Sequence, residues 1–247
     1  MCSTCGSRPS RDRGRGAAWV VPTGRRRPIP AAESSLGVVS FPEYLASWLN
    51  RYPSGRDWVD NVANFACRRS EAEWLGILRR KAGLTQGDME QLVTWKFGRW
   101  PAARRQPLAA VTGDRHGATA EVVRQAIADA ADRPDDDAGA MNMIRWSVKG
   151  FGVPMASVFL VLYLPDRFTI ADSRALETLR AWRGYPAEAR SFTTVGWVRY
   201  LAECRAILAG CQASGVVPRF EGGWTLRGVD QALWAANGAP GPGRSIA

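Results

Sequence analysis

The sequence predicts an all-α protein. Apolar side chains recur at helical spacing from Phe41 onward, the alternation typical of strands is hard to find, and capping residues precede several apolar runs. Such a chain of helices with short connections is typical of an all-α domain. Beyond the first quarter of the chain, helices are expected over residues 119–132, 138–148, 154–164, 173–182, 195–211 and 225–236.

The first expected helices are marked by aromatic and capping residues. An apolar face begins at Phe41 and continues through Trp48 to Tyr52, and a second one begins at Trp58. Ser70 followed by Glu73 has the capping-box pattern, and Thr85 can cap the next helix. These signals predict helix starts near residues 41, 71 and 86.

Composition divides the chain into three parts. Residues 1–36 are rich in Arg, Gly, Pro and Ser and show almost no apolar periodicity, so we expect a disordered basic arm there. Residues 37–240 form the expected helical domain, and residues 241–247 a flexible tail. Arg25, Arg26 and Arg27 could tether DNA, with an extension of no selected role as the alternative.

Charge favours a polyanionic partner. The chain carries 33 basic and 23 acidic residues, a formal net charge of +10, which favours nucleic acid over an acidic small molecule. The longest apolar run, residues 153–164, is too short to span a bilayer, and the N-terminus lacks the apolar core of a secretion signal. We therefore expect a cytoplasmic, nucleoid-associated monomer with reduced cysteines and no membrane partner.

The segment around residues 143–174 carries the chemistry. Gly150 and Gly152 flank a tight turn between two helical patterns, and glycine lets a backbone approach a partner closely. Backbone amides at the start of the second helix would bind a phosphate without reading its base. Asp172 follows at the start of the next expected helix.

This segment resembles the helix-hairpin-helix of the endonuclease III superfamily of DNA glycosylases, in which a Gly-x-Gly hairpin, a helix of small residues and an Asp follow one another. Asp172 lies eighteen residues after Pro154, the spacing that separates the catalytic lysine from the Asp in bifunctional members. Residues 95–99, Trp-Lys-Phe-Gly-Arg, also look like a motif of bacterial relatives. The resemblance covers about residues 70–213.

The resemblance implies a two-lobed helical glycosylase with its DNA cleft between the lobes and a hairpin at about residues 138–164. Asp172 would stabilise oxocarbenium character at the anomeric carbon and orient or deprotonate the attacking water. The residues implied to bind double-stranded DNA are Lys149, Gly150, Phe151, Gly152, Val153 and Arg174. The candidates for the base pocket are Trp95, Lys96, Arg99 and Trp146.

Two departures from that superfamily narrow the expectation. Pro154 replaces the lysine that would form a Schiff base, so we expect a monofunctional enzyme without lyase activity that leaves an abasic site. Cys204 and Cys211 repeat the first spacing of an iron–sulfur loop, but Ser214 and Phe220 stand where the last two thiolates would be. We expect buried thiols there and no cofactor or metal.

Several alternatives remain open from sequence. Asp172 could serve only as an N-cap, and the two glycines could form a plain αα-hairpin turn, which would leave a non-catalytic DNA-binding protein. A third alternative, an RNA-binding helical protein, is supported only by the positive net charge. His116 is expected in a loop, and the Cys2 and Cys5 pair is incomplete as a zinc site. As substrates, damaged bases and hypermodified bases of phage DNA, removed in antiviral defence, are both open.

Overall fold

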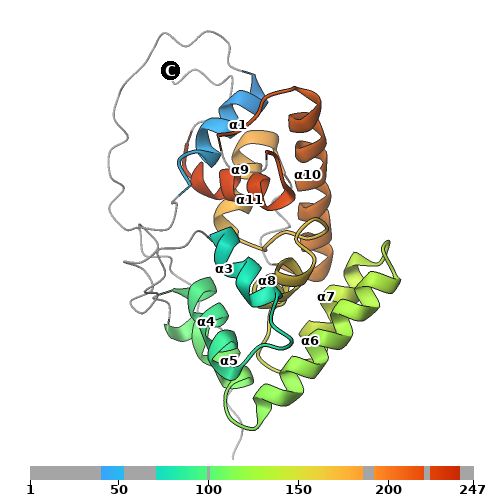
Figure 1. Ribbon diagram of the computed structural model, residues 1–247. Helices are drawn as coiled ribbons and strands as arrows, with labels where there is room; N and C mark the ends of the chain where they lie inside the picture. The colour runs from blue at the N-terminus through green and yellow to red at the C-terminus, as the bar shows by residue number, and fades with distance from the viewer. Residues whose placement is uncertain (1–39, 53–70, 99–100, 186–191, 220–222, 240–247) are drawn as a thin grey trace, which may run out of the picture. The chain divides into compact units, whose positions relative to one another are not determined.

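The computed structural model describes residues 40–52, 71–98, 101–185, 192–219 and 223–239. All of them belong to one compact unit, Val38–Ala247. Over these ranges the chain forms ten helices and no strand, which confirms the all-α prediction (Figure 1). The expected arm, tail and Ser70 cap, the helix from Trp58 and the Cys2 and Cys5 pair lie outside the described residues.

Packing contacts divide the helices into two groups (Figure 1). The first group consists of the six helices from α3 through α8. In it α4 contacts α5, α5 contacts α6, and α6 contacts α7, while α8 contacts α3, α4, α6 and α7. The second group joins α1, α9 and α10 to α11, and α10 also contacts α7 of the first group. The bounds are α1 Phe41–Leu49, α3 Glu71–Arg79, α4 Gln86–Phe97, α5 Pro101–Val111, α6 Arg115–Asp132, α7 Asp137–Ser147, α8 Val153–Tyr163, α9 Ser173–Arg183, α10 Thr194–Ala213 and α11 Leu226–Ala235.

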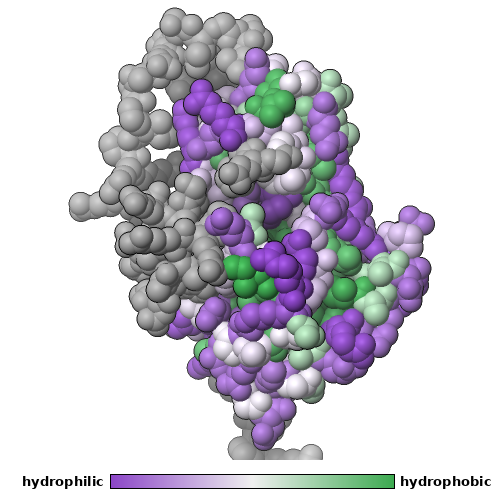
Figure 2. Space-filling view, viewed as in Figure 1, coloured by the Kyte–Doolittle hydropathy of each residue, from purple (hydrophilic) through white to green (hydrophobic). Residues whose placement is uncertain are grey.

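Helix α8 is the centre of the first group. Its sequence is apolar on every side, which is typical of a helix surrounded by protein. Its residues are accordingly buried from Met155 through Leu162, as is Val153 at its start. On the face drawn in Figure 2, apolar residues show as separate patches within a mostly hydrophilic surface.

Sequence periodicity located most of these helices, and one was missed. The expected ranges from α7 to α11 agree with the structure to within two residues at each end, and Thr85 caps α4 as predicted. Helix α5 was not expected. It contains Pro107, which is buried, although proline inside a helix removes one backbone hydrogen bond and usually ends the helix.

His116 also differs from its expected place in a loop. Helix α6 begins at Arg115, earlier than the predicted 119, so that His116 lies in its first turn. The ring Nε2 of His116 lies 3.0 Å from the carbonyl oxygen of Leu84. This half-buried contact gives the histidine a structural role between α6 and the segment before α4.

Candidate active site

Asp172 is the N-cap of α9, as one of the two sequence readings predicted. Its backbone is extended (φ −131°, ψ 130°) and its Oδ1 accepts a hydrogen bond of 3.0 Å from the backbone amide of Arg174. A carboxylate at this position also gains from the helix dipole. The capping role uses only one of its two oxygens.

The segment that brings the chain from α8 to Asp172 is firmly anchored. Phe168 is fully buried and stacks on the ring of Trp197 with 5.6 Å between centroids. The indole Nε1 of Trp197 donates to the carbonyl of Thr169 at 3.1 Å, and the amide of Ala171 donates to Oγ of Ser157 in α8 at 2.9 Å. These bonds fix the backbone immediately before Asp172 to both helical groups.

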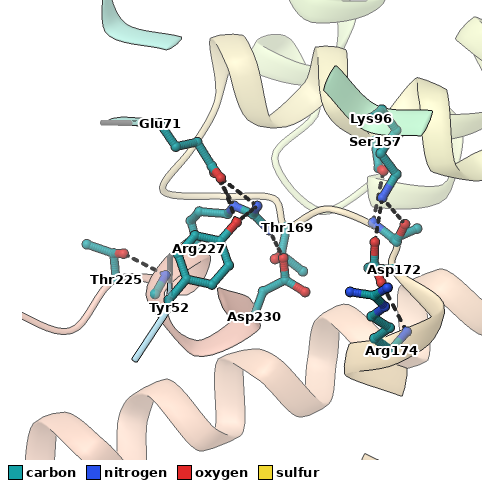
Figure 3. A network of polar contacts seen from close by, with 12 residues as sticks. Tyr52, Glu71, Lys96, Ser157, Thr169, Asp172, Arg174, Thr225, Arg227 and Asp230 are labelled. Atoms are coloured by element: carbon teal, nitrogen blue, oxygen red, sulfur yellow. Dashed lines mark hydrogen bonds and ion pairs between the residues drawn. The ribbon is translucent and has the colours of Figure 1, made fainter. Parts of the chain in front are cut away.

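The second oxygen of Asp172 contacts Lys96, a residue 76 positions away at the end of α4 (Figure 3). The Nζ of Lys96 lies 3.0 Å from Oδ2 of Asp172 and donates to the carbonyl of Ala171 at 2.8 Å. The lysine side chain is only 8% exposed, whereas that of Asp172 is 25% exposed. The contact joins two residues that sequence analysis had singled out separately.

The surroundings of Asp172 favour its ionised form. Burial is the largest influence on its pKa and raises it, because a low-dielectric setting disfavours a carboxylate. The charge and hydrogen bond of Lys96, the amide of Arg174 and the charge of Arg227 together outweigh burial, so the pKa lies below the ordinary value. At neutral pH the site therefore holds a carboxylate that can accept a proton or stabilise a cation.

Asp172 and Lys96 line a small cavity of about 30 Å³. That volume holds about a single water molecule. The cavity lies where the end of α1, α4, the segment before α9 and α11 meet. Its lining residues are Tyr52, Trp95, Lys96, Ile170, Asp172, Arg227 and Trp234.

On one side the cavity is bounded by a buried polar network around Arg227 (Figure 3). The guanidinium donates from Nε to Glu71 Oε1 at 2.7 Å and from Nη2 to Glu71 Oε2 at 3.1 Å, and from Nη1 it contacts Asp230. Tyr52 donates its hydroxyl to Glu71 at 2.8 Å, and the hydroxyl of Tyr200 donates to Asp230. The network ties α3, α10 and α11 together at the edge of the site.

Sequence analysis missed this network. Arg227 and Asp230 lie three residues apart on a helix whose other buried residues are apolar except for Gln231, and charges on such a buried face were the available signal. Their main partner Glu71 is 156 residues away from Arg227, which no local pattern indicates. A further hollow of about 210 Å³ is lined by residues of α1, α3, α8 and α11. Arg227 lines both this hollow and the cavity beside Asp172.

The hairpin between α7 and α8 has the predicted place, but its two glycines have different roles. Gly150 has a positive φ of 106°, and a Cβ there would lie 2.8 Å from the carbonyl oxygen of Gln106 in α5. Gly152 is the N-cap of α8 with extended backbone (φ −94°, ψ 178°), which any residue adopts. Only Gly150 needs to be glycine for conformation and packing.

The outer surface of the hairpin consists mainly of backbone. The side chains of Phe151 and Val153 are buried, and the ring of Phe151 stacks on that of Phe159 with 5.4 Å between centroids. Lys149 and Gly152 are exposed. Among the described residues, the amides of Gly152 and Val153 have no backbone acceptor, and of the two residues Gly152 is exposed whereas Val153 is buried.

The structure brings some of the predicted pocket residues together and separates others. Trp95 lines the cavity and packs edge to face against Trp74 at 5.6 Å between centroids. Trp146 does not belong to this cavity: it is 76% exposed and lines a hollow between α6 and α7. Arg174 is exposed, and Arg99 lies outside the described residues.

Cys204 and Cys211 are buried free thiols on α10, as their apolar stripe predicted. Burial raises the pKa of Cys204 above its usual value and that of Cys211 to about 11, so both hold their protons at neutral pH. No group of three metal-binding side chains occurs among the described residues. The absence of a cofactor stays a prediction.

Comparison of the chain with protein-family models, with curated proteins and with solved structures found no match. In the part of the chain that the structure describes, no helix is both long enough and apolar enough to cross a membrane. The geometry of the site therefore carries the functional argument.

Proposed function

We propose that the protein is a monofunctional DNA glycosylase that hydrolyses the N-glycosidic bond of a damaged or modified base and leaves an abasic site. One observation carries the proposal: the ionised Asp172 at the start of α9, with one oxygen oriented by Lys96 and the other by the amide of Arg174. It is a fixed, partly exposed anion beside a cavity. Such a group can stabilise a positive charge that develops next to it.

In the proposed mechanism, the glycosidic bond lengthens and positive charge builds up at the anomeric carbon. Asp172 stabilises this cation and then accepts a proton from the water that attacks it. Lys96 is the positioning residue, because its ammonium keeps Asp172 ionised and holds its Oδ2 in place. The sugar keeps the hydroxyl of the water, and the proton that Asp172 accepted passes through solvent to the departed base, so that Asp172 returns to its carboxylate form.

The hairpin supports DNA as the partner. The amides of Gly152 and Val153, which have no backbone acceptor among the described residues, stand at the N-terminus of α8, where the helix dipole favours an anion, and Gly152 is exposed there. Exposed Lys149 lies beside them and adds a positive charge. A phosphate bound there would position the duplex without reading its sequence.

The arrangement of two helical groups suits a duplex bound between them. Asp172 belongs to the group of α1, α9, α10 and α11, and Lys96 belongs to the group that holds the hairpin. We propose that these groups are the two lobes of a glycosylase, with the site at their junction. The protein would act as a cytoplasmic, nucleoid-associated monomer on double-stranded DNA.

The cavity of about 30 Å³ is too small for a nucleobase. A base extruded from the duplex must therefore displace part of the lining, in addition to the few kcal/mol that unstacking and unpairing cost. The net charge of +10 offsets some of that cost through phosphate contacts. Substrates with weakened pairing, such as damaged bases, or hypermodified bases of phage DNA fit this requirement.

The proposal includes base release without strand cleavage. Pro154, in the first turn of α8, has no amine to attack the sugar. Lys96 is the nearest amine, but it is held by two acceptors, Ala171 O and Asp172 Oδ2. An amine that carries its proton in such an ion pair is a poor nucleophile.

A non-catalytic helix-hairpin-helix DNA-binding protein is the alternative function. The hairpin amides and Lys149 serve both functions equally. What favours the enzyme is Lys96, because an N-cap alone does not require a buried ammonium on its second oxygen.

The test is incubation of the purified protein with a panel of duplexes that carry damaged or phage-type modified bases. We expect a released base, detected by mass spectrometry, and strands that break only after alkali treatment. Borohydride should trap no covalent adduct. If no member of the panel loses its base while duplex DNA still binds, the DNA-binding alternative replaces the enzyme.

A further inference from the structure

The exposed Arg174 stacks on the half-buried Trp234 at the edge of the cavity. The guanidinium carbon of Arg174 lies 4.8 Å from the centroid of the Trp234 ring. Trp234 also lines the cavity together with Asp172, and its ring contacts that of Tyr52 at 5.5 Å between centroids. The side chains of Arg174 and Trp234 have no part in the mechanism given above.

The backbone of Arg174 is fixed, whereas among the described residues this stack is the one contact that holds its guanidinium. Its amide donates to Asp172, and its carbonyl accepts a hydrogen bond of 3.0 Å from Nδ2 of Asn237. Its exposed guanidinium has no hydrogen bond or ion pair to any other described residue. The side chain can therefore leave the tryptophan face without disturbing the N-cap.

We propose that Trp234 is the stacking platform for the extruded base and that Arg174 covers this platform until the base replaces it. The inference rests on the proposed function. It also avoids the conflict between the small cavity and the size of a base, because Arg174 is exposed and does not line the cavity, so the buried lining can stay in place. The ring face uncovered in this way lies close to Asp172, since the residue that covers it, Arg174, donates its backbone amide to Asp172.

The exchange is favourable in energy. A base that stacks on an aromatic side chain gains more than an exposed arginine does over the same ring. The displaced guanidinium keeps its positive charge next to the DNA and can contact a phosphate. The platform itself accepts any base, because every base has a π face, so recognition of the substrate base must come from other residues.

The test separates base stacking from backbone binding with two duplexes. One carries a single 2-aminopurine opposite cytosine, a mismatch that lowers the cost of extrusion. The other carries a tetrahydrofuran at the same position and so has no base to stack. The ratio of their affinities reports the platform alone, since phosphate contacts are common to both.

Two variants should move this ratio in opposite directions. Trp234→Leu removes the platform and should lower the preference for the 2-aminopurine duplex by about ten-fold. Arg174→Ala removes the cover and should raise it by about two- to five-fold, while affinity for both duplexes falls because a phosphate contact is lost. Trp234→Phe keeps an aromatic face and should restore most of the preference.

Emission of 2-aminopurine gives a second readout, because the fluorophore is quenched on an aromatic ring and bright when unstacked. Bound to Trp234→Leu it should be several-fold brighter than bound to the wild type. An unchanged affinity ratio and equal emission in folded Trp234→Leu would overturn the platform. Base release from the duplex panel is measured separately, so that platform and enzyme can fail independently of each other.

Discussion

Two carboxylates near the cavity, Asp172 and Asp230, show how differently one residue type can be used in the same protein. Asp230 is fully buried, contacts Arg227 and accepts a hydrogen bond from Tyr200. Asp172 pairs with Lys96 and keeps a quarter of its side chain exposed. The first carboxylate is enclosed by the fold, and the second lines a small cavity and stays partly exposed.

Their pKa values move in opposite directions for a physical reason. Burial raises the pKa of Asp230 and is not fully offset by Arg227 and Tyr200. For Asp172, burial also raises the pKa, but Lys96, the Arg174 amide and Arg227 together lower it below the ordinary value. This difference indicates that the Arg227 network stabilises the fold, whereas Asp172 is kept charged and partly exposed.

The largest effect on stability is expected from Arg227→Met. The substitution leaves Glu71 and Asp230 buried without their partner, and breaking a buried ion pair from one side costs about 3–5 kcal/mol. Urea unfolding should measure the loss. Arg174→Met, which changes an exposed arginine, is the matched control and should stay within about 0.5 kcal/mol of the wild type. Equal stability of the two variants would show that the network is not scaffold.

The two hairpin glycines provide the next contrast. Gly150→Ala forces a Cβ against the carbonyl of Gln106 at a positive φ, and we expect a loss of about 2 kcal/mol in unfolding free energy. At Gly152 a Cβ would approach only Pro154, at 3.6 Å, so Gly152→Ala should fold normally.

Gly152→Ala should instead weaken binding to duplexes of any sequence by a few-fold, because its methyl group crowds the amides that would hold a phosphate. Binding titrations with two unrelated duplexes measure this. A loss confined to one sequence, or no loss at all, would speak against the hairpin as a phosphate site.

The last contrast concerns the pH dependence of base release, which tests the ion pair between Lys96 and Asp172. In the proposed mechanism, excision requires the ionised form of Asp172, and the lowered pKa should place the acid limb of the rate profile below the ordinary carboxyl range. Lys96→Gln removes the charge that lowers this pKa while burial still raises it. The acid limb should then move up by about one to three pH units.

Single-turnover rates from pH 4 to 8 measure this shift, with Lys81→Gln as a control. Lys81 forms an ion pair with Asp88 at 2.6 Å and does not line the cavity. If the Lys96→Gln profile matches that of the wild type, Lys96 does not set the ionisation of Asp172.

Local patterns were enough to predict most of the described helices and the position of Asp172. Apolar periodicity gave α7 to α11, and a capping residue after an apolar helix gave the N-cap. Helix α5 was missed because Pro107 breaks the expected pattern, yet the flanking residues continue the helix around it. These features depend on neighbours within a few residues.

Long-range pairs were beyond a single sequence. Lys96 was chosen as a pocket candidate, but nothing in the sequence indicated its ion pair with Asp172, and the partnership of Glu71 with Arg227 went unnoticed. Trp146 was predicted to line the same pocket, but it is exposed and lies at the hollow between α6 and α7. An aromatic residue at helical spacing faces the core, a site or solvent according to packing that only the folded chain determines.

The central claim is that Asp172 acts in chemistry beyond capping α9, and paired substitutions test it directly. Asp172→Asn and Asp136→Asn change two N-caps alike, since Asp136 caps α7 by accepting from the amide of Gly139 at 2.7 Å, and Asn caps as well as Asp. With a duplex that releases its base in the panel, Asp172→Asn should slow single-turnover base release about 100-fold or more. Asp136→Asn should remain within about two-fold of the wild type. Base release by Asp172→Asn at the wild-type rate would contradict the account.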